Sequence, residues 1–167
     1  MTCSCSFCRF DATVHLVQQH AYFIIIPMKK FCVQPCGYGY GLFAQTPIKA
    51  GEVIAELEGY ETDYAALSPQ QKRLVVYLGE GRCFVITNDV VFANHSCEPT
   101  CRLDDAGLLA LRDISPGEQL TFTYNVFPAK RQHLPEDWWW DALWSFDCGC
   151  GSPLCQGRID GYRFLDT

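Results

Sequence analysis

The sequence predicts a mostly β domain with few short helices. From Phe31 onward, short apolar runs alternate with Gly, Pro and Asp turns, a pattern typical of strand-rich chains. The 167 residues are 49% apolar and 19% charged, which indicates one globular core rather than disorder. Signals for the start of a helix occur in two places, and both of the helices they predict are short.

The predicted strands are short and closely spaced. Gly79-Glu80-Gly81 and residues 104–107 have the composition of hairpin connections. The expected strands are residues 31–34, 42–44, 53–57, 75–78, 83–87, 90–93, 108–112 and 119–124.

The first predicted helix covers residues 68–73. Ser68 can cap it, Pro69 fits its first turn, and Gln71 completes a capping box.

A second helix is expected within residues 125–145. Pro135, Glu136 and Asp137 favour a helix start, because acidic side chains stabilise the first turn. Trp140 and Trp144 would then share one apolar face with Leu143.

The net charge is −6, from 13 Lys and Arg against 19 Asp and Glu. A general nucleic-acid binder needs a basic surface, so we expect no direct nucleic-acid binding and a basic partner instead. The early apolar run at residues 21–28 contains Pro27, lacks a preceding basic segment, and is too short to span a membrane. We therefore expect a cytoplasmic protein, or a nuclear one if the source is eukaryotic.

The chain has 11 cysteines, an odd number that cannot all pair within one chain. In a reducing compartment, clustered cysteines more often bind metal or react than form disulfides. Three of them, Cys3, Cys5 and Cys8, lie in residues 1–27, which lack clear periodicity. This lead is interpreted as a second small metal site, as a disordered segment, or as a start assigned too far upstream of Met28.

The densest cysteine group is Cys148, Cys150 and Cys155, with Gly and Pro between them. Structural zinc takes four tetrahedral ligands, so this group lacks one. Either Cys97 or Cys101 could supply the fourth, which would tie the C-terminal segment to the middle of the domain.

Two further motifs are ambiguous alone. Glycines at positions 37, 39 and 41 permit close backbone approach to a ligand, or form a plain turn between strands. His95 and Cys97 could form the pair of a zinc-stabilised cysteine hydrolase, but residues two apart would need unusual backbone geometry to touch.

Taken together and in order, these motifs resemble the SET-domain family of protein lysine methyltransferases. The glycine motif precedes Leu42-Phe43-Ala44, and the C-terminal cysteine motif is similar to a post-SET segment. The matching stretches are residues 39–44, 94–99, 117–124 and 146–157.

The resemblance implies a fold of small curved sheets with a C-terminal pseudoknot. It implies a lead at 1–27, a SET domain at 28–124, a Trp-rich helical insertion at 125–145 and a post-SET zinc segment at 146–162. The insertion would serve as a lid over the lysine channel or simply pack its apolar face.

The resemblance also implies S-adenosylmethionine and zinc as cofactors. Tyr124 would be the catalytic tyrosine, and Phe122 would line the substrate channel. The residues implied to bind S-adenosylmethionine are Gly39, Tyr40, Gly41, Asn94, His95, Tyr124 and Phe146, and the implied zinc ligands are Cys97, Cys148, Cys150 and Cys155.

The implied function is methylation of lysine on a protein substrate, for which basic histone tails suit an acidic enzyme. In the family, a phenylalanine at the position of Phe122 is associated with di- or trimethylation. The chain departs from the family pattern at Leu57, where a channel tyrosine is common, at Val91, where Arg is common, and at Thr123, where Asp is common; Tyr77 is a candidate substitute for the tyrosine. A catalytically weak SET module that binds cofactor or a partner is therefore the alternative.

Overall fold

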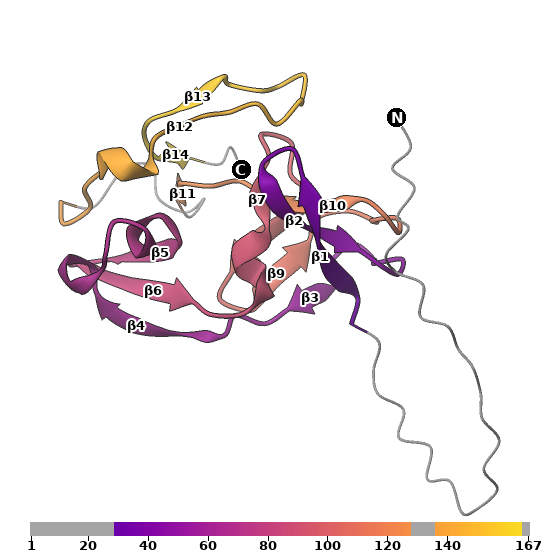
Figure 1. The fold of residues 1–167 in the computed structure, drawn as a ribbon, viewed down its shortest axis with the longest axis horizontal. Coiled ribbons are helices and arrows are strands. Elements are labelled where there is room, and N and C mark those ends of the chain that lie inside the picture. Colours follow the sequence, from indigo (N-terminus) through magenta and orange to yellow (C-terminus); the bar gives the residue numbers. More distant parts are fainter. Residues whose placement is uncertain (1–28, 128–135, 165–167) are drawn as a thin grey trace, which may run out of the picture.

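Strands dominate the computed structural model, which describes residues 29–127 and 136–164 (Figure 1). Within these ranges the strands form five small sheets, and the helices are four single-turn 3-10 helices with no α-helix. The predicted mostly β fold with few short helices is confirmed. Among the described residues, no helix has the length and apolar character that a membrane span requires.

The largest sheet has four strands in the order β1-β2-β10-β7. β1 and β2 form an antiparallel hairpin, and β2 pairs antiparallel with β10. β7 runs parallel to β10, with Asn94 opposite Thr121 and His95 opposite Phe122. Two motifs that are far apart in sequence therefore lie side by side. The bounds are β1 Phe31–Cys36, β2 Gly39–Ala44, β7 Asn94–His95 and β10 Gln119–Phe122.

A second sheet has the order β3 (Val53–Ala55), β9 (Gly107–Ala110), β8 (Cys101–Asp104). The hairpin predicted at residues 104–107 joins β8 to β9. Gly107 has a φ of 114°, and a Cβ there would lie 2.2 Å from the Ala55 carbonyl oxygen, so only glycine fits.

The third sheet has the order β4 (Gly59–Asp63), β6 (Arg82–Ile86), β5 (Val75–Gly79). The predicted turn between β5 and β6 is confirmed. Its central residues, Glu80 and Gly81, have φ of 51° and 72°, as a primed hairpin turn requires. β4 was not predicted, because its residues are mostly polar and exposed.

The C-terminal part folds back over the body of the domain in two short pairings (Figure 1). β11 (Val126–Phe127) pairs parallel with β14 (Arg163–Phe164), and β12 (Phe146–Asp147) pairs antiparallel with β13 (Arg158–Ile159). The threading expected of a pseudoknot stays a prediction.

The first predicted helix is shorter than expected. Only Gln71–Arg73 (η2) is helical, although the predicted capping box is present. The Ser68 backbone N–H donates to Gln71 Oε1 at 3.1 Å, and the Gln71 N–H donates to Ser68 Oγ at 3.4 Å. One more single turn, η1 (Tyr64–Ala66), precedes it.

The strand predicted at residues 90–93 is wrong. Residues Asp89–Phe92 form a 3-10 helix, η3, after the turn-forming Asn88. Val90 and Ala93 are both 1% exposed. A single helical turn points residues three apart to the same side, whereas a strand would point them to opposite faces.

The longer helix predicted from Glu136 is also wrong, because only Ala142–Trp144 (η4) is helical. Asp137, expected to favour a first turn, instead accepts the Glu80 backbone N–H at 3.0 Å. Its carbonyl accepts the Tyr77 hydroxyl at 3.3 Å. Contacts with the β5–β6 turn therefore override the local helix preference.

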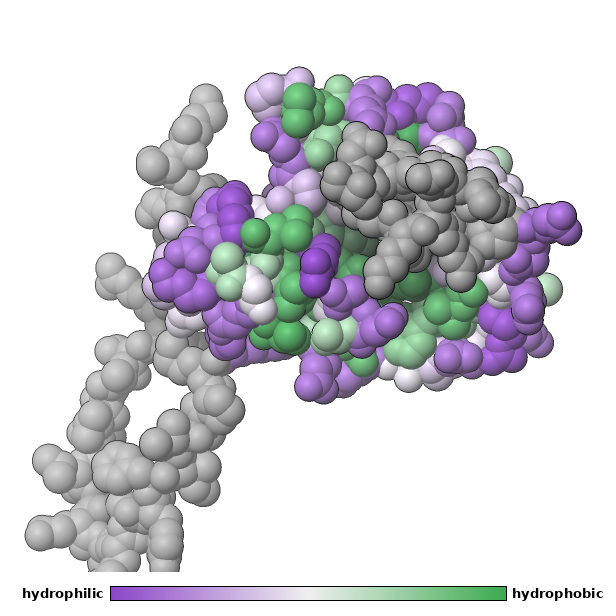
Figure 2. Space-filling model, turned by 180° about the vertical axis from the view of Figure 1, so that it is seen from behind, coloured by the Kyte–Doolittle hydropathy of each residue, from purple (hydrophilic) through white to green (hydrophobic). Residues whose placement is uncertain are grey.

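Two apolar clusters lie within the domain. The main one packs residues from the first two sheets, including Leu42, Leu108 and Leu120, each 0% exposed. The second contains Tyr64, Leu67, Cys83 and Val85, with Trp144 packed against it. Figure 2 shows hydrophobic residues gathered near the centre of one face, with hydrophilic residues around its margin.

Candidate functional site

The parallel pairing of β7 with β10 brings the Asn94-His95 motif next to Tyr124. The Tyr124 backbone N–H donates to His95 Nδ1 at 3.0 Å, and the Tyr124 hydroxyl donates to the Ala93 carbonyl oxygen at 2.6 Å. Burial raises the pKa of Tyr124 to about 12. Its hydroxyl therefore keeps its proton at neutral pH and acts as a hydrogen-bond donor.

The tautomer of His95 follows from the same contact. Because Nδ1 accepts a backbone N–H, the neutral imidazole carries its proton on Nε2. Nε2 lies 3.4 Å from Cys97 Sγ, so this N–H points at the sulfur. His95 thus connects the tyrosine to the cysteine group.

His95 and Cys97, two residues apart, were expected to need unusual backbone geometry to touch, yet their side chains are in contact. The strand β7 ends at His95 and the chain bends at Cys97, and the two side chains meet at this bend. The hydrolase interpretation still has no base, because Nδ1 accepts the Tyr124 N–H and Nε2 is the protonated nitrogen.

Aromatic rings surround the tyrosine. The Phe122 ring centroid lies 4.8 Å from that of Tyr124, and the Phe146 centroid lies 5.9 Å from it. Phe146 also lies 5.3 Å from His95. The ring of Tyr124 therefore lies among apolar rings from β10 and β12.

The glycine motif lies against the same group of residues. Asn94 Nδ2 donates to the Tyr40 carbonyl oxygen at 2.9 Å. Gly39 has a φ of 96°, and a Cβ on Gly41 would lie 2.5 Å from Gln119 Nε2 and 3.0 Å from Asn94 Nδ2. The positive φ favours glycine at position 39, and a side chain at position 41 would have to displace the amide groups of Gln119 and Asn94. The predicted glycine, Asn94-His95 and Tyr124 motifs therefore converge.

Four cysteine sulfurs form a separate group. The Sγ atoms of Cys97, Cys148, Cys150 and Cys155 all lie within 4.8 Å of one another. Tetrahedral zinc with Zn–S bonds of about 2.3 Å separates its sulfurs by about 3.8 Å, and Cys97 Sγ lies 3.9 Å from Cys148 Sγ. The number, type and spacing of these donors fit zinc.

The structure also separates the two candidates for the fourth ligand. Cys97 joins the group, and its backbone N–H lies 3.5 Å from Cys150 Sγ. Cys101 is buried in β8, and its sulfur lies 3.4 Å from Thr100 Oγ1. Burial raises the pKa of Cys148 to about 12, with smaller contributions from its sulfur neighbours. A cation would be needed to hold several thiolates together here.

Leu57, which departs from the family pattern, and Tyr77, its candidate substitute, both have contacts elsewhere in the fold. Leu57 is partly buried against the main apolar cluster. Tyr77, suggested as a substitute for the channel tyrosine, donates its hydroxyl to Asp137 and accepts the Gly81 N–H at 3.1 Å. The Tyr77 hydroxyl is therefore engaged in holding the β5–β6 turn.

Seven aromatic residues form a cluster that covers the third sheet, which we call the aromatic cluster. The stacked pair Trp139 and Trp144 has centroids 5.3 Å apart, and Trp144 Nε1 donates to the Lys72 carbonyl oxygen at 2.8 Å. The members are Tyr64, Tyr77, Trp138, Trp139, Trp140, Trp144 and Tyr162.

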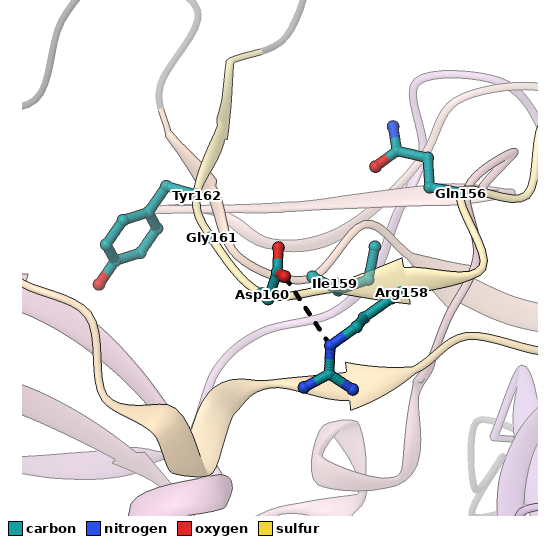
Figure 3. A pocket seen from close by; sticks show the side chains of 6 residues that line it. All are labelled: Gln156, Arg158, Ile159, Asp160, Gly161 and Tyr162. Atoms are coloured by element: carbon teal, nitrogen blue, oxygen red, sulfur yellow. Dashed lines mark ion pairs between the residues drawn. The ribbon is translucent and has the colours of Figure 1, made fainter.

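A shallow pocket of about 120 Å³ lies beside β13 (Figure 3). It is lined by Gln156, Arg158, Ile159, Asp160, Gly161 and Tyr162, and Arg158 pairs with Asp160 at 3.8 Å. Ligand pockets usually enclose about 300 Å³ or more, and this one contains none of the converging residues. It is smaller than ligand pockets usually are, and the residues that converge around Tyr124 do not line it.

Two contacts around the site were not predicted. The Tyr38 hydroxyl donates to the Gly149 carbonyl oxygen, and Ser152 Oγ donates to Glu98 Oε2 at 2.7 Å. Both join segments more than fifty residues apart, so no local sequence pattern marks them.

The chain belongs to the SET domain family, whose pattern matches residues 39–125. It is 29% identical over 147 residues to the Arabidopsis thaliana histone-lysine N-methyltransferase ASHH2, covering 74% of this chain and 8% of that protein. It is 32% identical over 151 residues to an H3 lysine-36 specific histone-lysine N-methyltransferase of Cryptococcus neoformans, covering 77% of this chain and 16% of that protein. The chain thus spans less than a fifth of these relatives' length.

Two further matches support the family and the fold. The Aspergillus flavus methyltransferase flvH is 32% identical over 104 residues, covering 60% of this chain and 52% of that protein. A crystal structure from Plasmodium falciparum, described as a histone methyltransferase, has a TM-score of 0.51 at 17% identity. It covers 57% of this chain and 93% of that chain, and it shows the likeness of fold.

Proposed function

We propose that this chain transfers methyl groups from S-adenosylmethionine to lysine side chains of a protein substrate. The relatives named as histone-lysine N-methyltransferases support this activity. The observation that carries the proposal is the convergence of Asn94-His95 with Tyr124, whose buried hydroxyl is held by the Ala93 carbonyl.

The substrate amine must be neutral to act as a nucleophile. A free lysine has a pKa of about 10.4, so about one amine in a thousand is neutral near pH 7.4. Apolar surroundings lower the pKa of an ammonium by removing water from it. Phe122 and Phe146 supply such surroundings beside the Tyr124 ring.

Tyr124 would orient the amine. Its hydroxyl stays protonated, so it can stabilise one position of the reacting group but cannot serve as an anionic base at neutral pH. The Ala93 carbonyl fixes the direction of that hydroxyl. Most of the acceleration would come from alignment within a dry site.

The residues assigned to S-adenosylmethionine are Gly39, Tyr40, Gly41, Asn94, His95, Tyr124 and Phe146. S-adenosylmethionine supplies an electrophilic methyl group on a sulfonium. Backbone groups of Gly39 and Gly41 would hold the methionine end, and Phe146 would cover the adenine ring. The contact from Asn94 to the Tyr40 carbonyl supports a shared binding surface for these motifs.

Zinc would be held by Cys97, Cys148, Cys150 and Cys155 as a structural ion. Four thiolate ligands fill a tetrahedral site and leave no open position for chemistry. Its role would be to fasten the post-SET segment beside the Asn94-His95 motif, because Cys97 follows His95 by two residues.

We further propose a basic protein substrate such as a histone, and action in the nucleus. The names of the relatives and the chain's net charge of −6 support this assignment. Phe122 lacks a hydroxyl that would hold water in the site, which favours di- or trimethylation.

A catalytically weak module that binds cofactor or a partner is the second candidate. Leu57 packs against the main apolar cluster where the family often has a channel tyrosine, and the Tyr77 hydroxyl is engaged elsewhere. Neither Leu57 nor Tyr77 therefore supplies a hydroxyl to the proposed channel.

Transfer of labelled methyl groups to purified histones and to a lysate separates these candidates. The wild-type chain is compared with Tyr124→Phe, which keeps the ring and removes the hydroxyl. We expect transfer by the wild type and at least a hundredfold lower rate for the variant. Tight cofactor binding with no transfer to any protein would favour the binding module.

A further inference from the structure

The cysteine loop, residues 148–155, contacts the residues next to both of the motifs assigned to the cofactor. On one side, its Cys150 sulfur lies 3.5 Å from the Cys97 N–H, and Ser152 Oγ donates to Glu98. On the other side, the Gly149 carbonyl accepts the Tyr38 hydroxyl. The loop therefore bridges from the Asn94-His95 segment to the glycine-rich hairpin.

Tyr38 lies in the turn of the β1–β2 hairpin, directly before Gly39. Cys36 and Gly39 are the last paired residues, so Gly37 and Tyr38 form the tip. Tyr38 is 62% exposed, which leaves little apolar burial to explain a large aromatic residue there. Its hydroxyl bond to Gly149 is the contact that connects this tip to the cysteine loop.

Gly149 is shaped to accept this contact. A Cβ at position 149 would lie 2.6 Å from the Tyr38 hydroxyl oxygen and 3.7 Å from Cζ. The clash is therefore with the hydroxyl itself, and a phenylalanine at position 38 would relieve it. The φ of Gly149 is not positive, so alanine could adopt the backbone conformation without strain.

We propose that Tyr38 is a positioning residue that latches the cysteine loop against the glycine-rich hairpin and so retains bound S-adenosylmethionine. This inference rests on the proposed function. The cysteine group anchors one end of the loop beside Cys97, and the Tyr38–Gly149 hydrogen bond anchors the other. With the second anchor removed, the loop opens more often at the hairpin, and the cofactor leaves faster.

The test measures release of S-adenosylmethionine from the zinc-loaded full chain by stopped-flow tryptophan fluorescence. We expect Tyr38→Phe to dissociate about threefold to tenfold faster than wild type, the effect of losing one neutral hydrogen bond. Bound zinc and the melting temperature should not change. Tyr60→Phe is the matched control, since Tyr60 in β4 is also an exposed tyrosine, at 49%, and this variant should release the cofactor at the wild-type rate.

A double-mutant cycle makes the test specific to the latch. Gly149→Ala should speed release in the wild-type background, because its methyl group displaces the hydroxyl. In the Tyr38→Phe background the same change should have little further effect. An equal effect of Gly149→Ala in both backgrounds would contradict the latch.

The remaining outcomes are also decisive. If wild type binds cofactor and Tyr38→Phe releases it at the same rate, the latch is wrong while the proposed function stands. If Tyr38→Phe loses zinc, Tyr38 supports the metal site instead of retaining the cofactor. If the wild-type chain binds no S-adenosylmethionine, both proposals fail.

Discussion

The Tyr124 hydroxyl donates to the Ala93 carbonyl oxygen at 2.6 Å, across 31 residues of sequence. Ala93 directly precedes the Asn94-His95 motif, so this bond holds the tyrosine beside that motif. Because burial raises the pKa of Tyr124 to about 12, the bond persists over the whole neutral and mildly alkaline range.

The raised pKa of Tyr124 predicts a loss of stability at high pH. A free tyrosine has a pKa of about 10, so the unfolded chain releases this proton at lower pH than the folded chain. The stabilisation is therefore complete below pH 10 and is lost as pH rises from about 10 to about 12. Urea unfolding across this range should show a decline in unfolding free energy that is smaller in Tyr124→Phe; equal declines would contradict the assignment.

Asn94→Ala should weaken cofactor binding. The substitution removes the amide that donates to the Tyr40 carbonyl, and leaves that carbonyl and the glycine-rich hairpin less well positioned. Loss of an exposed hydrogen bond costs about 0.5–1.5 kcal/mol, which corresponds to about a twofold to tenfold rise in Kd. Calorimetric titration with S-adenosylmethionine measures this Kd. An unchanged Kd would show that Asn94 does not contribute to cofactor binding.

The zinc assignment predicts that Cys97→Ser and Cys148→Ser each lose metal. Each removes one of four thiolates, and three protein ligands do not complete a structural site. Metal analysis should give about one equivalent of zinc for wild type and well below half for each variant. Cys101→Ala is the control, because Cys101 lies outside the sulfur group and should retain metal. A full equivalent in both serine variants would show that the ligand set is wrong.

Trp144→Ala tests whether the aromatic cluster serves packing or acts as a lid. Trp144 contacts the second apolar cluster, stacks on Trp139, and donates to the Lys72 carbonyl. Replacing a core tryptophan with alanine costs about 3–5 kcal/mol, and a half-buried one should fall at or below the lower end. Trp139→Ala, at a site 39% exposed, should cost less.

The two roles differ in their effect on activity. Pure packing predicts that the Trp144→Ala protein that remains folded methylates at the wild-type rate. A lid predicts a raised KM for the protein substrate at temperatures where the variant is fully folded.

Gly107→Ala should destabilise the second sheet. A methyl group would lie 2.2 Å from the Ala55 carbonyl oxygen, and the φ of 114° is unfavourable for alanine. We expect a cost of at least about 2 kcal/mol by denaturant unfolding. Gly37→Ala, where a Cβ would meet no atom within 4 Å, should be close to neutral.

Much of the strand pattern could be predicted from the sequence. The hairpin turns that follow β5 and β8 were located, because Gly-containing turns leave a local signature. β4 was missed because an exposed edge strand needs no apolar residues, and 90–93 was mistaken for a strand because β-branched residues occur in both structures. Interpretations of residues 1–27, and of positions 128–135 within the insertion, lie outside the described residues.

The family was also readable from the sequence, because its motifs are short and contiguous. By contrast, the choice between Cys97 and Cys101 stayed open on spacing alone. The Trp-rich part of residues 125–145 was expected to be helical, yet contacts of Asp137 and Trp144 with distant segments decided its form.

The sequence by itself determined the strand-rich class, the order of the motifs and the types of side chain that carry the chemistry. Only the tertiary structure decided which of these side chains meet. The parallel pairing of β7 with β10 sets Asn94-His95 beside Tyr124, and the return of the C-terminal segment places Gly149 on Tyr38. The physical reason is that composition and spacing record local preferences, whereas hydrogen bonds between distant segments depend on how the sheets pack.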